Sequence, residues 1–208
     1  MKKLSLLLCA ILLTTYACKN EKKAPETTAQ TTENTATTNN FVVKPEGTTV
    51  KWTAYKTTAK KGVGGEFTTL KFNEKSGASP EQALNNLNFS IPISSVFTNN
   101  AGRDTKIKTY FFGKMLDTDF IKGTIKVVNG TYLASLTLNG VTKDLPLNAE
   151  INGRRVALTG TMQLKNWNAL EALASLNKIC YDLHKGADGI SKTWEDVSIE
   201  INTFLRKG

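Results

Sequence analysis

The chain has 208 residues, with 27 Lys and Arg against 18 Asp and Glu, and a formal net charge of +9. Its basic residues are scattered and do not interleave with aromatic residues, so the charge does not predict nucleic-acid binding. The single histidine, His184, provides too few ligands for a zinc site and only one candidate base for a Ser-His or Cys-His catalyst. We therefore expect no metal, no cofactor and no catalytic residue.

The first 17 residues predict a signal peptide, because a short basic start precedes an apolar run, Leu4 to Leu13, that is too short to span a bilayer. Ala17 followed by Cys18 resembles the lipobox of bacterial lipoproteins, in which a small residue precedes the lipidated cysteine, although Thr15 stands where that motif usually has Leu. We expect lipidation of Cys18. The alternative is an ordinary secreted protein that is cleaved near Ala17.

Residues 18–40 predict a flexible linker, since their many Thr, Asn and Gln side chains cannot bury enough surface to offset the entropy of ordering. The residue after Cys18 is Lys19, and not the Asp that resembles an inner-membrane retention signal. We therefore expect an outer-membrane lipoprotein of the cell envelope that faces the periplasm or the surface. Residues 41–208 predict one domain, monomeric or dimeric, in which Cys180 has no disulfide partner.

The first half of this domain alternates apolar and polar residues in stretches that predict strands. The four strands expected before residue 130 are Thr48–Tyr55, Val63–Phe72, Leu87–Phe97 and Phe120–Val128. A short helix is expected to start at Ser79-Pro80, since Ser suits the cap and Pro suits the first helical position. Apolar residues at helical spacing predict a second helix from Arg103 to Phe112.

The second half predicts three strands between Thr131 and Leu164, joined by Asn139-Gly140 and Asn152-Gly153. These dipeptides suit two-residue hairpins because both residues can adopt positive φ. A longer helix from Ala169 to Leu183 and a last strand from Trp194 to Phe204 follow. The sequence thus predicts an all-β domain of eight antiparallel strands, with short helical insertions and one longer helix before the last strand. Such a sheet removes its edges by closing into a barrel.

An eight-stranded barrel is either filled by its own side chains or wide enough for one small ligand. The residues expected to face the interior are apolar: Trp52, Phe89, Ile91, Ile93, Tyr132, Leu136, Leu138, Leu145, Leu147, Val156, Leu158, Met162, Val197, Ile199 and Ile201. Alternation is identical in both cases, so the residues alone favour the simpler filled core and leave a ligand cavity as the alternative.

Several segments together resemble the YceI-like family of bacterial periplasmic and secreted proteins. They are Gly64–Phe67, Gly102–Asp104 with Phe111-Phe112, Leu136–Lys143 with Leu145–Leu147, and Lys192–Val197. The stretch Leu-Thr-Leu-Asn-Gly-Val-Thr-Lys is the most specific, and the resemblance covers nearly all of residues 41–208. It implies an eight-stranded antiparallel, lipocalin-like β-barrel that binds a long isoprenoid or similar lipid and has no catalytic residues. The resemblance therefore favours a cavity over a filled core.

We accordingly expect an envelope lipoprotein, attached to the membrane by its N-terminal lipid, that binds or carries an apolar lipid of isoprenoid type. The alternative is a ligand-free barrel that acts as a protein-interaction or stress-response module. Arg103 is a candidate contact for a ligand head group, because a guanidinium offers two donors to a phosphate. Its simpler role is an ion pair with Asp104 or a helix cap.

Overall fold

The computed structural model describes residues 40–208. The expected signal peptide, the lipidation site Cys18 and all but the last residue of the expected linker lie outside the described residues. Among the described residues, no helix combines the length and the apolar character needed to cross a bilayer.

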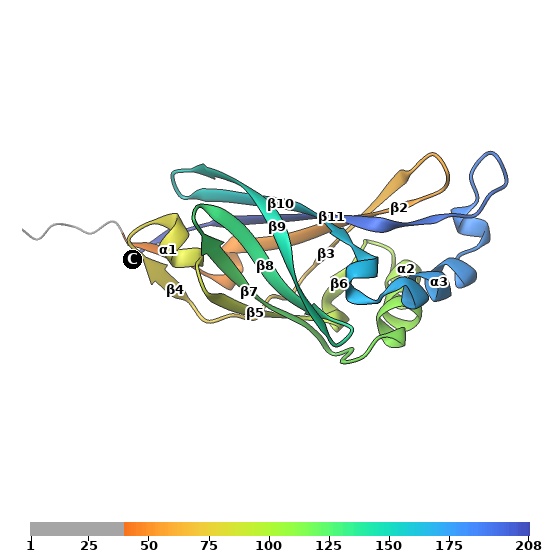
Figure 1. Cartoon of the computed structure of the whole chain (residues 1–208), viewed down its shortest axis with the longest axis horizontal. Coiled ribbons are helices and arrows are strands. Elements are labelled where there is room, and N and C mark those ends of the chain that lie inside the picture. The colour runs from red at the N-terminus through yellow and green to blue at the C-terminus, as the bar shows by residue number, and fades with distance from the viewer. Residues whose placement is uncertain (1–39) are drawn as a thin grey trace, which may run out of the picture. The chain divides into compact units, whose positions relative to one another are not determined.

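The domain is built around one antiparallel sheet of nine strands (Figure 1). In spatial order these are β5 (Leu87–Pro92), β7 (Phe120–Val128), β8 (Thr131–Leu138), β9 (Val141–Asn152), β10 (Arg155–Gln163), β11 (Thr193–Phe204), β2 (Thr48–Lys56), β3 (Lys61–Phe67) and β6 (Val96–Phe97). The expected all-β fold is thus confirmed, with nine strands in place of eight. The count differs because the strand expected over Leu87–Phe97 is divided into β5 and β6 by the 3-10 turn η2, Ile93–Ser95.

The barrel closes along a seam between β3 and β5 that is not a regular ladder. After β3 the chain follows β5 as an irregular segment, so the strand expected over Val63–Phe72 ends at Phe67. Lys71 and Ser90 exchange two backbone hydrogen bonds, of 2.9 and 2.8 Å, and Thr68 N donates to Ser95 O at 3.0 Å. These bonds bring the first and last parts of the sheet together and leave the barrel nearly closed.

One end of the barrel is covered by a second, three-stranded sheet of order β12 (Arg206–Lys207), β1 (Phe41–Val43) and β4 (Lys75–Gly77). The 3-10 turn η1, Pro45–Gly47, joins β1 to β2, and α1, Pro80–Leu84, packs against β4. Ser79 caps α1 as expected, because its Oγ accepts a hydrogen bond from Gln82 N at 3.3 Å. Val43 and Leu205 are almost completely buried at this end.

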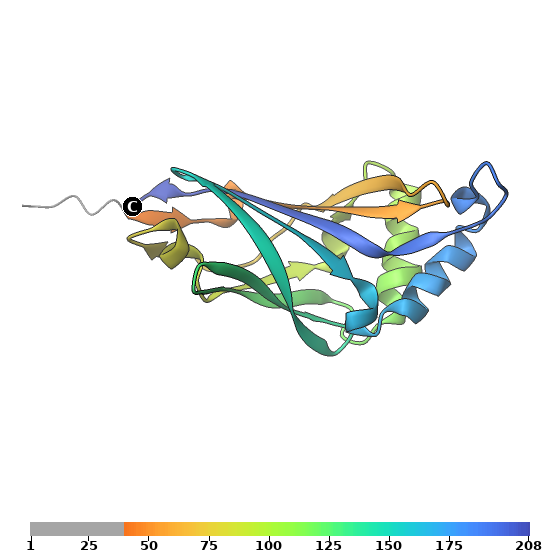
Figure 2. The ribbon, with the colours of Figure 1, turned by 45° about the horizontal axis from the view of Figure 1, so that its top comes forward.

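Helices cover the opposite end, where α3, Leu170–Ile179, packs against the turn η3 (Figure 2). The segment that leads there runs from α2, Ala101–Lys106, through the π-helical turn η3, Ile107–Phe111, to the 3-10 turn η4, Phe112–Lys114. The helix expected over Ala169–Leu183 ends at Ile179, because Cys180 leaves helical geometry at φ −105° and ψ 17°. A separate 3-10 turn, η6 (Asp182–His184), follows it.

The hairpin turns account for the tight connections between β7, β8, β9 and β10. Asn139-Gly140 joins β8 to β9 with φ of 52° and 69°, as the sequence predicts. Asn129-Gly130 joins β7 to β8 in the same way. The third turn is shifted by one residue, since Asn152 pairs with Arg155 and only Gly153 has positive φ.

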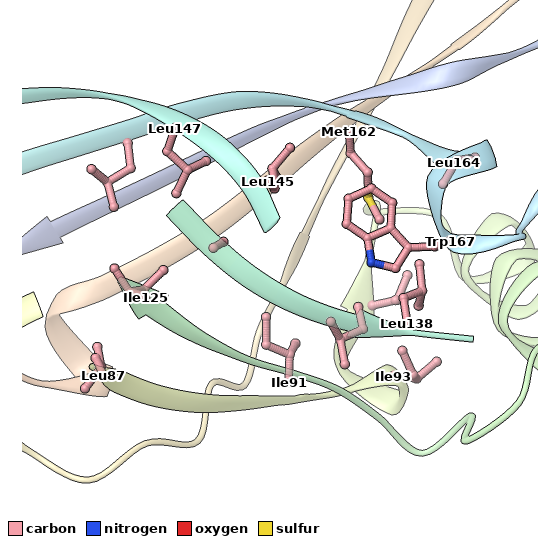
Figure 3. Packing of buried hydrophobic residues seen from close by; sticks show 14 of the residues in the cluster. Leu87, Ile91, Ile93, Ile125, Leu138, Leu145, Leu147, Met162, Leu164 and Trp167 are labelled. Atoms are coloured by element: carbon pink, nitrogen blue, oxygen red, sulfur yellow. The ribbon is translucent and has the colours of Figure 1, made fainter. Parts of the chain in front are cut away.

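Buried side chains fill much of the space between the sheets and the end covers. Trp167, on the 3-10 turn η5 (Leu164–Trp167), is 1% exposed and lies among Leu138, Met162 and Leu164 (Figure 3). Its indole nitrogen donates to Leu136 O at 2.9 Å, which anchors the turn after β10 to β8.

Candidate functional site: an apolar cavity inside the barrel

The interior of the barrel contains a cavity of about 210 Å³. Its lining comes from the inner faces of the strands and from both end covers, and it includes no charged side chain. Three threonines, at positions 48, 193 and 203, are the polar residues of the lining besides two tryptophans. The barrel is therefore not filled by its own side chains, and its interior offers almost purely apolar contact.

Twelve of the fifteen side chains that the sequence assigns to the interior line this cavity. They are Trp52, Phe89, Ile91, Leu136, Leu138, Leu145, Leu147, Leu158, Met162, Val197, Ile199 and Ile201. The other three are buried elsewhere in the core: Ile93 in η2, Tyr132 in β8 and Val156 in β10. Alternation thus identified the inward face along most of the strands, but it did not distinguish packed positions from positions along the cavity.

Alternation failed at two places. Alternation continued through the segment Leu87–Phe97 predicts that Phe97 faces inward, but the turn η2 shifts the pattern, so Val96 is buried and Phe97 is 43% exposed. Alternation from Leu145 and Leu147 likewise predicts that Ala149 and Ile151 face inward, yet both are exposed near the end of β9.

The helical end supplies lining residues that strand patterns cannot reveal. Ile107, Phe111 and Phe112 reach the cavity from η3 and η4, and Leu173 and Leu176 reach it from α3. The sequence does indicate that Leu173 and Leu176 are buried together, because their helical spacing places them on one face of the helix. Leu70 and Phe72 also line the cavity from the irregular seam, and no local pattern marks them.

Trp52 contributes the largest side chain on the β2 wall, and it depends on a glycine across the pair β2–β3. Gly65 lies opposite Trp52 in register, and a Cβ built on Gly65 would come within 2.3 Å of Trp52 Cζ2. The buried Nε1 of Trp52 has no hydrogen-bond partner within the described residues.

Tyr132 is the other buried side chain with an unpaired polar atom in the described part of the chain. Burial and the neighbouring carboxylate of Glu81 raise the pKa of its phenol to about 12. The phenol is therefore protonated at physiological pH and cannot act as a base.

His184 joins the helical cover to the barrel by hydrogen bonds. Its Nδ1 lies 2.7 Å from Thr193 Oγ1, and Thr193 Oγ1 donates to Asn177 Oδ1 of α3 at 2.6 Å. Burial and the positive charge of Lys56 lower the pKa of the imidazole from its ordinary value of 6.5. Nδ1 also lies 3.2 Å from Asn177 Oδ1, so the neutral ring links α3 to β11. Thr193 lines the cavity, which places this link beside it.

Arg103, the candidate head-group contact, lies on α2 and does not line the cavity. Asn100 Oδ1 caps α2 by accepting from Arg103 N at 2.9 Å. Asp104 accepts hydrogen bonds from Thr98 N and Thr98 Oγ1, at 2.9 and 2.6 Å, and not from the Arg103 side chain. The expected ion pair is therefore replaced by a cap at Asn100 and a link from Asp104 to Thr98.

Within residues 40–208, the titratable side chains are not grouped in a way that could hold a metal ion. No group of three or more His, Cys, Asp or Glu side chains converges there. Burial raises the pKa of the Cys180 thiol, which disfavours the reactive thiolate.

Comparison with known proteins points to one family. A model of the YceI-like domain matches residues 41–204. The fold is similar to a polyisoprenoid binding domain from Saccharophagus degradans, at 13% identity and a TM-score of 0.60, covering 81% of this chain and 98% of that chain. No curated protein matches the chain.

Two further solved structures share the architecture. BcnA from Burkholderia cenocepacia is similar at 13% identity and a TM-score of 0.51, covering 79% of this chain and 99% of that chain. The YCEI protein of Campylobacter jejuni is similar at 22% identity and a TM-score of 0.52, covering 71% and 86%. At these identities the neighbours establish the fold alone. The family match spans nearly all of the described residues, and the chain belongs to the YceI-like domain family.

Proposed function

We propose that this protein binds or carries an apolar lipid of isoprenoid type inside its barrel and performs no catalytic step. The observation that carries the proposal is the cavity of about 210 Å³, whose lining includes no charged side chain. The polyisoprenoid binding domain with the same fold supports the choice of ligand class.

Apolar contact alone provides enough free energy for such a ligand. Each buried CH₂ group contributes about 0.8 kcal/mol, so ten buried carbons contribute roughly 8 kcal/mol before the cost of association. The volume also bounds the ligand, because an apolar protein cavity of about 150 Å³ holds a molecule the size of benzene. A long isoprenoid therefore requires side chains at the helical end or the seam to move.

The alternative, a ligand-free interaction module, predicts a barrel interior filled by its own side chains. The cavity favours the lipid-binding proposal over this alternative. Attachment to the outer membrane through a lipid on Cys18 is part of the same proposal, and it is supported by the residues around Cys18.

The test is native mass spectrometry of the mature chain from residue 18, with Cys18→Ser to remove any lipid anchor. We expect a bound mass of isoprenoid type that organic extraction releases. Ala54→Phe places a ring in the cavity wall and should reduce the bound fraction at least fivefold. Thr53→Phe, at the next position of β2, places the same ring on the other face and is the matched control.

Thermal unfolding of both variants checks that they remain folded. An empty spectrum under gentle conditions, together with no uptake of added polyprenol, would contradict the proposal and favour the interaction module.

Arg103 remains our candidate for a head-group contact, because α2 leads directly into η3, which lines the cavity. If this is correct, Arg103→Ala weakens binding of a polyprenyl phosphate and leaves binding of the neutral polyprenol unchanged. Equal affinities of the wild type and the variant for both lipids would exclude the contact.

A further inference from the structure

The helical end of the barrel projects two neighbouring loops beyond the core (Figure 1). One is the turn between β2 and β3, and the other is the loop between η6 and β11. We define the tip surface as residues 56–61 together with residues 181–192. Tyr181, Leu183 and Ile190 lie on it with exposed fractions of 52%, 58% and 56%.

Hydrogen bonds hold the two loops together, so these apolar side chains are displayed by an ordered framework. Thr57 N donates to Lys192 O at 2.9 Å, and Thr58 Oγ1 donates to Asp188 Oδ2 at 2.7 Å. Lys56 Nζ donates to Leu183 O at 2.8 Å. The exposure of Leu183 and its neighbours is therefore fixed by contacts between loops that are more than one hundred residues apart.

The tip surface is basic as well as apolar. It contains five lysines, at positions 56, 60, 61, 185 and 192, and two aspartates, at positions 182 and 188, for a net charge of three positive units. Asp196 lies just outside the tip surface and pairs with Lys60 at 2.8 Å. Counting this carboxylate reduces the net charge to +2. His184 adds no charge at neutral pH, because burial and Lys56 lower the pKa of its ring.

We propose that the tip surface docks on the surface of an anionic lipid bilayer. Exposed apolar side chains among lysines are the combination by which proteins bind membrane interfaces, since apolar groups enter the head-group boundary while lysines meet anionic lipids. Single exposed apolar residues are common on any protein. Here three of them lie within ten residues of one loop, and five lysines belong to the same tip surface.

The tip surface also lies next to the lining of the cavity. Thr193 and Trp194, which line the cavity, directly follow Lys192, and Trp194 Nε1 donates to Thr57 O in the neighbouring loop at 2.8 Å. Docking therefore brings the helical end of the cavity to the bilayer. Transfer of a lipid at that contact rests on the proposed function, whereas docking itself does not.

The opposite end of the barrel offers an internal control. Val128 and Ile151 are 51% and 38% exposed there, in two separate hairpins that also contain the basic residues Lys126, Arg154 and Arg155. If any exposed apolar residue on this basic protein were sufficient for membrane binding, the two ends of the barrel would bind membranes equally well.

The test is flotation of the mature chain from residue 18, carrying Cys18→Ser, with vesicles of phosphatidylglycerol and phosphatidylcholine in equal amounts. We expect binding at least tenfold weaker to vesicles of phosphatidylcholine alone, and weaker binding at high salt. Leu183→Ser with Ile190→Ser should reduce binding at least fivefold, and Lys61→Glu should reduce it further. Val128→Ser with Ile151→Ser should leave it within twofold of the parent.

Equal binding by the Leu183→Ser, Ile190→Ser variant would overturn the proposal, and so would an equal loss in the Val128→Ser, Ile151→Ser variant. Circular dichroism and thermal unfolding establish that both double variants are folded. Native mass spectrometry of the Leu183→Ser, Ile190→Ser variant separates the two proposals. If this variant no longer docks but still carries its bound lipid, the substitutions have changed the tip surface and not the cavity.

Discussion

At the scale of single residues, the inner wall of the barrel depends on one close approach between Trp52 and Gly65. The indole lies over the glycine so closely that a Cβ at position 65 would come within 2.7 Å of two of its ring carbons. The neighbouring Gly64 has no such constraint, because its nearest atom, Trp52 O, would lie 3.7 Å from an added Cβ. Two adjacent glycines of one strand therefore have different roles.

We expect Gly65→Ala to destabilise the domain by roughly 1–3 kcal/mol, because overpacking forces the indole out of its rotamer. Gly64→Ala, at which the added methyl group makes ordinary contacts, is the control and should cost less than about 1 kcal/mol. Urea denaturation followed by tryptophan fluorescence measures both free energies of unfolding. Similar values for the two variants would show that the indole can move at no cost.

The sequence predicted this class of feature but not its position. Glycine within a strand is typical of a bulge, a bend or a close backbone approach, and the segment of β3 contains three glycines. Only the register between β2 and β3 shows that Gly65, and not Gly64, lies opposite the indole. Likewise, alternation placed Tyr132 and Val156 inward, but which inward side chains pack solidly depends on the curvature of the whole barrel.

At the scale of elements, the two Asn-Gly hairpins of β8 look equivalent in sequence and differ in structure. Asn129 and Asn139 have φ of 49° and 52°, so both turns use the left-handed conformation that Asn tolerates. Asn139 also makes three hydrogen bonds. Its Oδ1 accepts from Leu116 N at 2.9 Å, and its Nδ2 donates to Trp167 O at 3.2 Å and Asn168 O at 2.9 Å.

Replacing each asparagine by alanine separates these contributions. Asn129→Ala should lower the free energy of unfolding by about 1 kcal/mol, because alanine adopts the left-handed conformation less readily than asparagine. Asn139→Ala should cost roughly 1–3 kcal/mol more, because the partners of its side chain lose their hydrogen bonds. Chemical denaturation of the two variants gives the difference directly. If the costs are the same, the turn contributes only its own geometry and does not anchor η5.

The elements that the sequence did not predict are the short ones. β1, β4 and β12 have two or three residues each, which is too few for a period of two to be recognised. The long strands were recognised because they alternate over eight or more residues. The end of α3 was misplaced because apolar residues continue at helical spacing through Leu183, although the helix stops at Ile179.

At the scale of the whole molecule, closing the ends of the barrel is as important as forming its wall. β1 is the central strand of the small sheet and pairs with both β12 and β4. Val43, at its end, is 1% exposed and also lines the cavity. These few residues thus connect the start of the domain to its core.

We expect a chain that starts at Asn40 to be as stable as a chain that starts at residue 18. A chain that starts at Thr48 should lose roughly 3–6 kcal/mol of its free energy of unfolding, because it lacks Phe41 and Val43, which pack against the core. The midpoints of guanidinium unfolding of the two truncated chains measure the difference. Equal midpoints would mean that β1 is only an accessory strand.

Whether the barrel is filled or hollow was the property that the sequence could not decide. Inward side chains alternate identically in both cases, and the volume left between them depends on strand tilt and on the helices that cover the end. The cavity is also lined by residues of η3, α3 and the seam, which belong to no strand pattern.

The pairing of β1 with β12 has a practical consequence for handling the protein. Phe41 lies opposite Lys207, and Gly208 N donates to Asn40 O at 2.9 Å, so the two ends of the domain meet at one pole of the barrel (Figure 1). A fluorescent reporter or purification tag fused after Gly208 would emerge beside the N-terminal entry point and leave the loops at the far pole unobstructed. The same proximity makes the domain suited to circular permutation, with a short linker joining the old ends and new ends opened at a solvent-exposed turn.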